Sequence, residues 1–236
     1  MRESRQSAPR TKPALVTSVK RLAQPGTPIV TYAIMALCVV VFAVEVVTGQ
    51  LVGSGSPIVN ALLYYPPYTS IQPWRMLTSL FVHGSILHIL FNMYSLFILG
   101  PELERLVGRW RFLALFLLSG LGGSVAVLLS TPGSAVIGAS GAIFGLFGAY
   151  FVIARHLGGN SRQLIVVIVI NLVIGFIVPN IAWQAHVGGL LIGALVAFVL
   201  VHTRDRQKRR IQLPLLAGVL ALLIAATVIG SQIIGA

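Results

Sequence analysis

The sequence predicts an all-α membrane protein, a polytopic bundle of seven transmembrane helices. The first reason is composition, because 56% of the 236 residues are hydrophobic and only 9% are charged, whereas soluble domains carry about 25% charged residues. The second reason is a series of apolar runs near the roughly 20 residues that a helix needs to cross a bilayer. The third is charge, because all 17 basic residues except Arg75 fall in segments that seven spans place on one side.

The expected spans follow one another with short connections after the second. They lie at 29–47, 77–100, 112–130, 136–154, 164–178, 181–202 and 213–234. The stretches "STPGS" at 130–134 and "VPN" at 178–180 are turn signals between successive spans. The longer segment 48–76 contains "YYPPYTSIQPWR", whose aromatic residues favour a membrane interface, and we expect it to lie against the bundle.

The basic residues also predict an orientation. Under the positive-inside rule, the tail 1–28 and the loop 203–212 are cytoplasmic, and the C-terminus lies outside. The net charge of +12 is therefore a topology signal, and we expect no nucleic acid as a partner. The Arg- and Ser-containing tail is also compatible with a mitochondrial transit peptide, but the topology already explains its charge and we favour a cytoplasmic tail. We expect the protein in a bacterial plasma membrane. Cys38 is the only cysteine, so an intramolecular disulfide is excluded.

Four polar residues of the 77–100 span share one helical face. Ser85, His88, Asn92 and Ser95 are separated by 3, 4 and 3 residues. Polar side chains at membrane depth are costly, so this face must look into the bundle or into a water-filled cavity. Hydrogen bonds between helices, worth about 0.6 kcal/mol on average, are sufficient to explain Ser85 and Ser95. We interpret His88 and Asn92, one turn apart, as a pair of hydrogen-bond donors, with interhelical bonding as the alternative.

Two glycine-lined faces predict a close contact between the 136–154 and 181–202 spans. His186 shares its face with Gly189 and Gly193, and a second glycine face follows Ser140. That second face consists of Gly141, Gly145 and Gly148. Small residues let two helices approach closely. If these faces meet, Ser140 and His186 come together near the outer ends of their helices; the alternative is that the glycines serve helix packing alone.

A serine beside a histidine indicates nucleophilic catalysis. Serine attacks well only when a base takes its proton, and histidine is suited to that task at neutral pH. The oxyanion then needs fixed donors, which His88, Asn92 and the Ser140 backbone N–H at a helix start can supply. No acid is placed to orient His186, because Glu45 lies in the first span and the other acids belong to the basic side. The sequence thus predicts a Ser–His dyad, without a metal site or another cofactor.

These residues resemble the rhomboid family of intramembrane serine proteases. The resemblance rests on "WR" (74–75), "HGSILHILFN" (83–92), "GASGAIFG" (138–145) and "AHVGGLLIG" (185–193), in the family's order. It implies a rhomboid-like bundle with a six-helix catalytic core at 29–202 and an additional helix at 213–236. It also implies Ser140 as nucleophile and His186 as general base and then general acid. His88 and Asn92 would stabilise the oxyanion together with the Ser140 backbone.

The same resemblance implies supporting roles. Phe144 matches the aromatic residue on which the catalytic imidazole stacks, and Gly138, Gly141 and Gly189 support the site. Four further matches are structural: Trp74 and Arg75 in the first outer loop, and Glu104 and Arg105 at the inner end of the second span. Two positions depart from some members, Ser79 from a histidine and Ala139 from a bulkier residue. Neither departure changes Ser140 or His186.

The sequence therefore predicts an intramembrane serine endopeptidase that cleaves transmembrane segments of single-span or polytopic membrane proteins. Its active site would open to the outside of the lipid bilayer. Two other classes stay open: a non-catalytic rhomboid-like chaperone that binds helices without cutting them, and a transporter in which His88, Asn92 and His186 line a polar path. Both predict that Ser140→Ala keeps its function, whereas a protease loses it.

Overall fold

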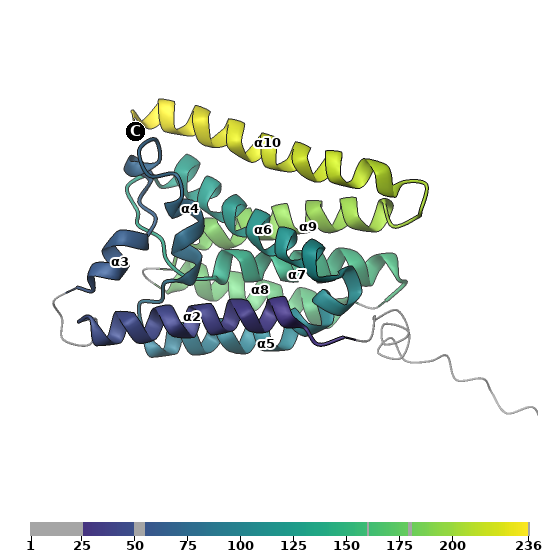
Figure 1. The fold of residues 1–236 in the computed structure, drawn as a ribbon, viewed down its shortest axis with the longest axis horizontal. Coiled ribbons are helices and arrows are strands. Elements are labelled where there is room, and N and C mark those ends of the chain that lie inside the picture. The colour runs from purple at the N-terminus through teal and green to yellow at the C-terminus, as the bar shows by residue number, and fades with distance from the viewer. Residues whose placement is uncertain (1–25, 50–54, 160, 179–180, 236) are drawn as a thin grey trace, which may run out of the picture.

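The protein is a bundle of antiparallel helices, seen in a computed structural model that describes residues 26–49, 55–159, 161–178 and 181–235 (Figure 1). Its seven longest described helices are α2 (Ile29–Val47), α5 (Ile86–Val107), α6 (Arg109–Ser130), α7 (Ser140–His156), α8 (Arg162–Ile177), α9 (Trp183–His202) and α10 (Arg209–Ile234). Four short elements lie between α2 and α5: α3 (Pro57–Leu62), η2 (Pro66–Tyr68), α4 (Arg75–Thr78) and η3 (Ser79–Phe81). The described residues otherwise pair only at an isolated bridge between Tyr64 and Val136, so the all-α prediction is confirmed.

Successive long helices run in opposite directions and give the bundle two distinct ends (Figure 1). The loop end carries α3, α4 and the starts of α5, α7 and α9. The basic end carries the α5–α6, α7–α8 and α9–α10 connections. Among the described residues, every lysine and arginine except Arg75 belongs to the basic end. The charge pattern of the sequence thus matches the alternation of the helices.

Five of the described helices are long and apolar enough to cross a membrane, namely α2, α5, α6, α9 and α10. The other two long elements are shorter, with 17 residues in α7 and 16 in α8. The count of seven spans therefore stays a prediction. Large apolar side chains cover the outer surfaces of these helices, for example Val40 of α2 and Leu191 of α9, as expected where a helix faces lipid.

Two spans, those of α5 and α7, begin at least four residues later than the sequence predicted. The span expected at 77–100 is α5, which starts at Ile86, because the Ser85 hydroxyl accepts the His88 N–H (3.2 Å) and caps the helix. The span expected at 136–154 is α7, which starts at Ser140 because Gly138 has a φ of +108° that interrupts any helix. The other spans differ from their predicted bounds by at most four residues, and α10 takes in the last part of the predicted loop 203–212.

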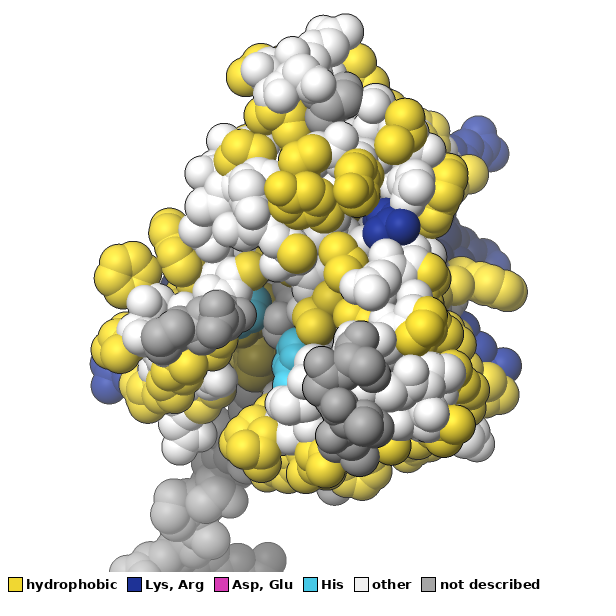
Figure 2. All heavy atoms as spheres, turned by 90° about the vertical axis from the view of Figure 1, so that its left-hand side faces the viewer, with side chains coloured by type: hydrophobic (Ala, Val, Ile, Leu, Met, Phe, Trp, Pro, Cys, Tyr) yellow, Lys and Arg dark blue, Asp and Glu magenta, His cyan; other side chains and the backbone are white. Residues whose placement is uncertain are grey.

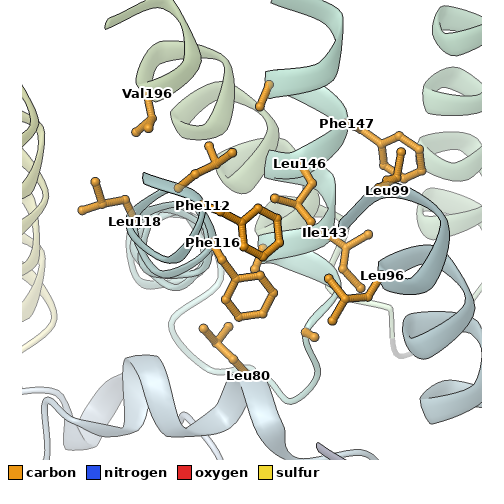
Figure 3. Packing of buried hydrophobic residues seen from close by; sticks show 14 of the residues in the cluster. Leu80, Leu96, Leu99, Phe112, Phe116, Leu118, Ile143, Leu146, Phe147 and Val196 are labelled. Carbon is orange, nitrogen blue, oxygen red and sulfur yellow. The ribbon is translucent and has the colours of Figure 1, made fainter. Parts of the chain in front are cut away.

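The buried core lies around α6 and α7. Figure 3 shows Phe112 and Phe116 of α6 beside Leu146 of α7, while Leu96 of α5 points towards Ile143. Four of these five side chains have no exposed surface, and Ile143 is almost fully buried. Within a bilayer such contacts stabilise by close packing rather than by removal of water. The core therefore holds α7 firmly between its neighbours.

The connection between α2 and α5 packs against the bundle, as predicted, over its described residues. Tyr64 is fully buried, and its backbone pairs with Val136 in both directions (3.0 and 2.8 Å). Arg75 donates through Nη1 to the carbonyl groups of Asn60 (2.7 Å) and Leu63 (3.3 Å). These bonds fix the loop end around the segment that leads into α7.

A buried carboxylate near the basic end joins α5 to α2. Glu104 accepts the N–H groups of Val30 (3.0 Å) and Thr31 (2.7 Å) and also the Thr31 hydroxyl (2.7 Å). These N–H groups belong to the first turn of α2, where a helix has no internal acceptors and favours a negative charge. The structural role that the resemblance implied for Glu104 is thus explained. Arg105, expected in the same cluster, is exposed instead.

Candidate active site

The turn before α7 presents Ser140 at the start of that helix. The Gly138 N–H donates to the carbonyl of Ser79 (2.8 Å). Ser79, which stands where some family members have a histidine, thus contributes its backbone carbonyl to this turn. A Cβ at Gly138 would lie 2.5 Å from His88 Nε2, and only glycine lets the turn approach α5 this closely. Ala139 is fully buried. Because Ser140 is the first residue of α7, its backbone N–H has no acceptor within the helix.

The predicted glycine faces of α7 and α9 do meet. A Cβ added to Gly189 would overlap the carbonyl oxygen of Gly141, and one added to Gly193 would overlap that of Gly145. The two helices therefore pack backbone against backbone, with no room for a side chain between them. This approach is closer than any pair of ordinary helix faces would permit.

The close approach brings His186 against Ser140. His186 Nε2 lies 2.9 Å from the Ser140 hydroxyl oxygen, a hydrogen-bond distance. The imidazole also stacks on the Phe144 ring, with centroids 4.1 Å apart and planes 9° from parallel. Since Phe144 is one turn after Ser140, a single helix carries both the hydroxyl and the surface that orients the histidine.

The second nitrogen of His186 faces α8 rather than an acid. His186 Nδ1 is buried and has no hydrogen-bond partner among the described residues. When Nε2 accepts the serine proton, Nδ1 must carry the hydrogen of the neutral ring. Besides the contact of Nε2 with Ser140, packing orients the ring, on Phe144 from one side and beside Gly175, where a Cβ would lie 3.1 Å from Nδ1. The sequence did not point to Gly175, because a single glycine in a mostly apolar run carries no sign of a neighbouring histidine.

The polar face of α5 lines the same cavity. Ser85, His88, Asn92 and Ser95 all border it, as their spacing predicted, together with Ser140 and His186. The Asn92 side-chain nitrogen donates to the His88 carbonyl (2.8 Å), which leaves its second N–H for another acceptor. The donors expected around an oxyanion thus border one cavity with the serine.

The cavity has a volume of about 590 Å³, within the range of small-ligand sites. Figure 2 shows histidine side chains in a hollow of the face that the loop end presents, framed by hydrophobic side chains. One wall comes from α8, through Asn171, Ile174 and Gly175. Asn171 was not predicted as a site residue either, although a polar amide inside an apolar run indicates a side chain that faces the bundle interior. The described residues contain no group of three or more His, Cys, Asp or Glu side chains that could hold a metal ion.

A separate buried network holds the turn before His88. The Glu45 carboxylate, near the loop end of α2, accepts the His83 N–H through both oxygens (3.1 and 3.3 Å). The His83 ring packs edge-on against His88, with centroids 5.1 Å apart. Burial, with a smaller contribution from His88, lowers the pKa of His83 to about 4, so this ring is neutral at pH 7. Because its oxygens bind the His83 N–H, Glu45 stabilises the turn that positions His88 and does not orient His186.

Several known proteins are similar to this chain in sequence. The rhomboid domain family model matches residues 70–203, more than half of the chain. Rhomboid protease GluP of Bacillus subtilis is 35% identical over 185 residues, which cover 75% of this chain and 36% of GluP. RHOMBOID-like protein 5 of Arabidopsis thaliana is 41% identical over 139 residues, 55% of this chain and 45% of that protein.

Rhomboid protease GlpG of Haemophilus influenzae is 31% identical over 188 residues, which cover 75% of this chain and 93% of GlpG. The chain thus spans less than half the length of the first two relatives and nearly all of the third. Together with the long apolar helices, these matches identify an integral, multi-pass membrane protein. The chain belongs to the rhomboid family.

Proposed function

We propose that this protein is an intramembrane serine endopeptidase that cleaves transmembrane segments with a Ser140–His186 dyad. The observation that carries the proposal is the 2.9 Å contact between His186 Nε2 and the Ser140 hydroxyl, at a helix start and inside a cavity. A nucleophile beside a base is the minimum arrangement for acyl transfer. Relatives that are named rhomboid proteases support the same activity.

In the proposed reaction, Ser140 attacks the scissile carbonyl carbon while its proton passes to His186 Nε2. The resulting oxyanion accepts hydrogen bonds from the Ser140 backbone N–H, His88 and Asn92, which border the same cavity. His186 then gives its proton to the leaving amine, and an acyl-enzyme remains on Ser140. Water, deprotonated by His186, hydrolyses that ester and restores the serine.

The substrate must leave its helical form before it can react. In a helix each carbonyl is occupied by an internal hydrogen bond, and lipid offers no replacement for a broken one. A polar cavity at the loop end supplies water and donors for the unwound segment. We therefore propose single-span or polytopic membrane proteins as substrates, cut near the end of a transmembrane helix.

The test is cleavage by purified protein in liposomes of a fluorogenic single-span substrate, with fluorophosphonate labelling in parallel. Mass spectrometry of the labelled protein should place the adduct on Ser140, and sequencing of the products should place the cut within or beside the apolar segment. A folded protein that neither labels nor cleaves several such substrates would favour a non-catalytic, helix-binding role.

The packing of His186 against α8 leads to a further prediction. Gly175→Ala should lower kcat about tenfold, because its Cβ would lie 3.1 Å from His186 Nδ1 and 3.3 Å from the Ile181 side chain, and a small displacement of a catalytic group is costly. Gly218→Ala in α10 is the matched control, since nothing lies within 4 Å of its Cβ. Equal rates in the two variants would show that α8 does not orient the imidazole.

The basic end defines the proposed orientation in a bacterial plasma membrane, with the N-terminus cytoplasmic and the active site facing outside. Residues 29–202 would form the catalytic core and 213–236 the additional helix. In intact cells, a membrane-impermeant thiol reagent should label a cysteine introduced at Ser134, in the connection before α7, and spare one at Arg206, beyond α9. The opposite pattern would reverse the orientation.

A further inference from the structure

A second cavity lies at the basic end, away from Ser140 and His186. It has a volume of about 670 Å³ and lies between the end of α5 and the starts of α2, α6 and α10, which Figure 1 shows at one end of the bundle. Four arginines line it: Arg105, Arg109, Arg111 and Arg209. Its size is that of a small-ligand site.

Within the part of the chain that the structure describes, the positive charge of this cavity is not balanced. Among the described residues, the guanidinium groups of Arg105, Arg109 and Arg209 form no hydrogen bond or ion pair. One acid, Glu104, also lines the cavity, but its oxygens accept the N–H groups at the start of α2. Positive charges gathered on the wall of one cavity repel one another, and a bound anion would offset that repulsion.

Arg111 is fixed on the cavity wall by a chain of bonds. Its Nε donates to the Gln212 side-chain oxygen (2.6 Å) and its Nη1 to the Val107 carbonyl (3.3 Å). The Gln212 amide donates in turn to the Thr203 hydroxyl (2.6 Å), and both of these residues are buried. The bonds use two of the five N–H donors of Arg111 and hold the group between α6 and α10. A pre-positioned guanidinium with spare donors suits phosphate oxygens.

The rim of the cavity is apolar and has the character of a membrane interface. Trp110 is 81% exposed, Leu213 is 75% exposed, and both line the cavity with Leu216. Tryptophan favours the level of the lipid headgroups. A ligand in this cavity would contact arginine side chains and apolar side chains at the same time. We propose that this cavity binds the phosphate-bearing headgroup of an anionic phospholipid, whose acyl chains lie along α10.

The positive-inside rule alone does not produce such a cavity. That rule is satisfied by basic residues anywhere in a cytoplasmic segment, as by Arg206 and Arg210, which do not line this space. The cavity-lining arginines instead come from three helices and converge. A bound headgroup would bridge α6 and α10, and so join the C-terminal helix to the rest of the bundle. The inference concerns lipid binding and does not depend on catalysis.

The fluorescence of Trp110 provides the test. The protein would carry Trp74→Phe and Trp183→Phe, which leave Trp110 as its only tryptophan, in nanodiscs with bromine-labelled phosphatidylglycerol or phosphatidylcholine. We expect half-maximal quenching at a several-fold lower fraction of phosphatidylglycerol. Arg109→Gln with Arg209→Gln should weaken this preference several-fold, because the change removes two guanidinium groups that would contact the phosphate. Arg109→Lys with Arg209→Lys should keep most of it.

Arg206→Gln with Arg210→Gln is the matched control, because it removes two charges from the same end but outside the cavity. This pair should keep the headgroup preference. Equal loss in both glutamine pairs, or no preference in the protein with intact arginines, would overturn the proposal. A preference that millimolar inorganic phosphate abolishes would identify a soluble anion as the ligand and would equally overturn the lipid assignment.

Discussion

Cleavage by the Ser140→Ala variant is expected to fall at least about 10³-fold, because the change removes the hydroxyl that His186 contacts at 2.9 Å. His186→Ala should lose a similar factor, since the serine then has no base. The two side chains act as one unit, so the double variant should lose little more than either single variant. The measurement is kcat/KM for a fluorogenic single-span substrate in liposomes.

Ser130→Ala serves as the control for removal of a hydroxyl. That residue ends α6, where its hydroxyl donates to the Ala126 carbonyl (2.5 Å), and the variant should keep wild-type cleavage. If Ser140→Ala retained a tenth of the wild-type rate, another nucleophile would have to be sought. Losses that add up in the double variant would mean that Ser140 and His186 work separately.

The contact between Ser140 and His186 could be anticipated because several patterns agree in the sequence. Polar residues in a span must face inwards, and the glycines beside Ser140 and His186 mark which faces can approach closely. The alternation of helix direction then places the starts of α5, α7 and α9 at the same end. The direction of each helix and the position of its polar and glycine residues together determine which side chains come into contact.

The helix starts could not be anticipated in the same way. Apolar composition extended the α5 span back to residue 77, yet residues 77–85 form the end of α4, the short element η3 and the connection to α5 at the loop end. Leu80 is buried there, and a Cβ on Gly120 of α6 would overlap its side chain. Apolar residues in this segment therefore fill the core beneath the loops. Hydropathy does not distinguish core packing from membrane spanning.

The buried acids show a second limit of the sequence. Glu45 and Glu104 both bind backbone N–H groups, of His83 and of Val30 and Thr31 respectively. Their partners lie 38 and 73–74 residues away in the sequence. Every residue except proline has a backbone N–H, so the amino-acid sequence does not show which N–H group a carboxylate will bind. Topology rightly separated Glu45 from His186. The predicted topology could not show that Glu45 positions the turn before His88.

The Gly189→Ala variant is expected to lose both stability and cleavage. Its Cβ would overlap the carbonyl oxygen of Gly141, and a backbone atom cannot rotate away as a side chain can. Overpacking of this kind costs about 3 kcal/mol or more, and should lower the apparent Tm in detergent by roughly 10 °C. Separation of α7 from α9 should also break the contact between Ser140 and His186, so fluorophosphonate labelling should fall with cleavage.

Gly141→Ala provides a graded comparison on the opposite face of the same contact. Its Cβ would lie 3.3 Å from the Ala185 carbonyl oxygen, a tight contact that a shift of a few tenths of an ångström relieves. The order of effect on Tm and on labelling should therefore be Gly189→Ala, then Gly141→Ala, then wild type. Equal behaviour of the two variants would mean that helix separation is not what limits the dyad. A stable Gly189→Ala protein that still cleaves would mean that α7 and α9 are less closely packed, and that the serine and histidine can react across a wider gap.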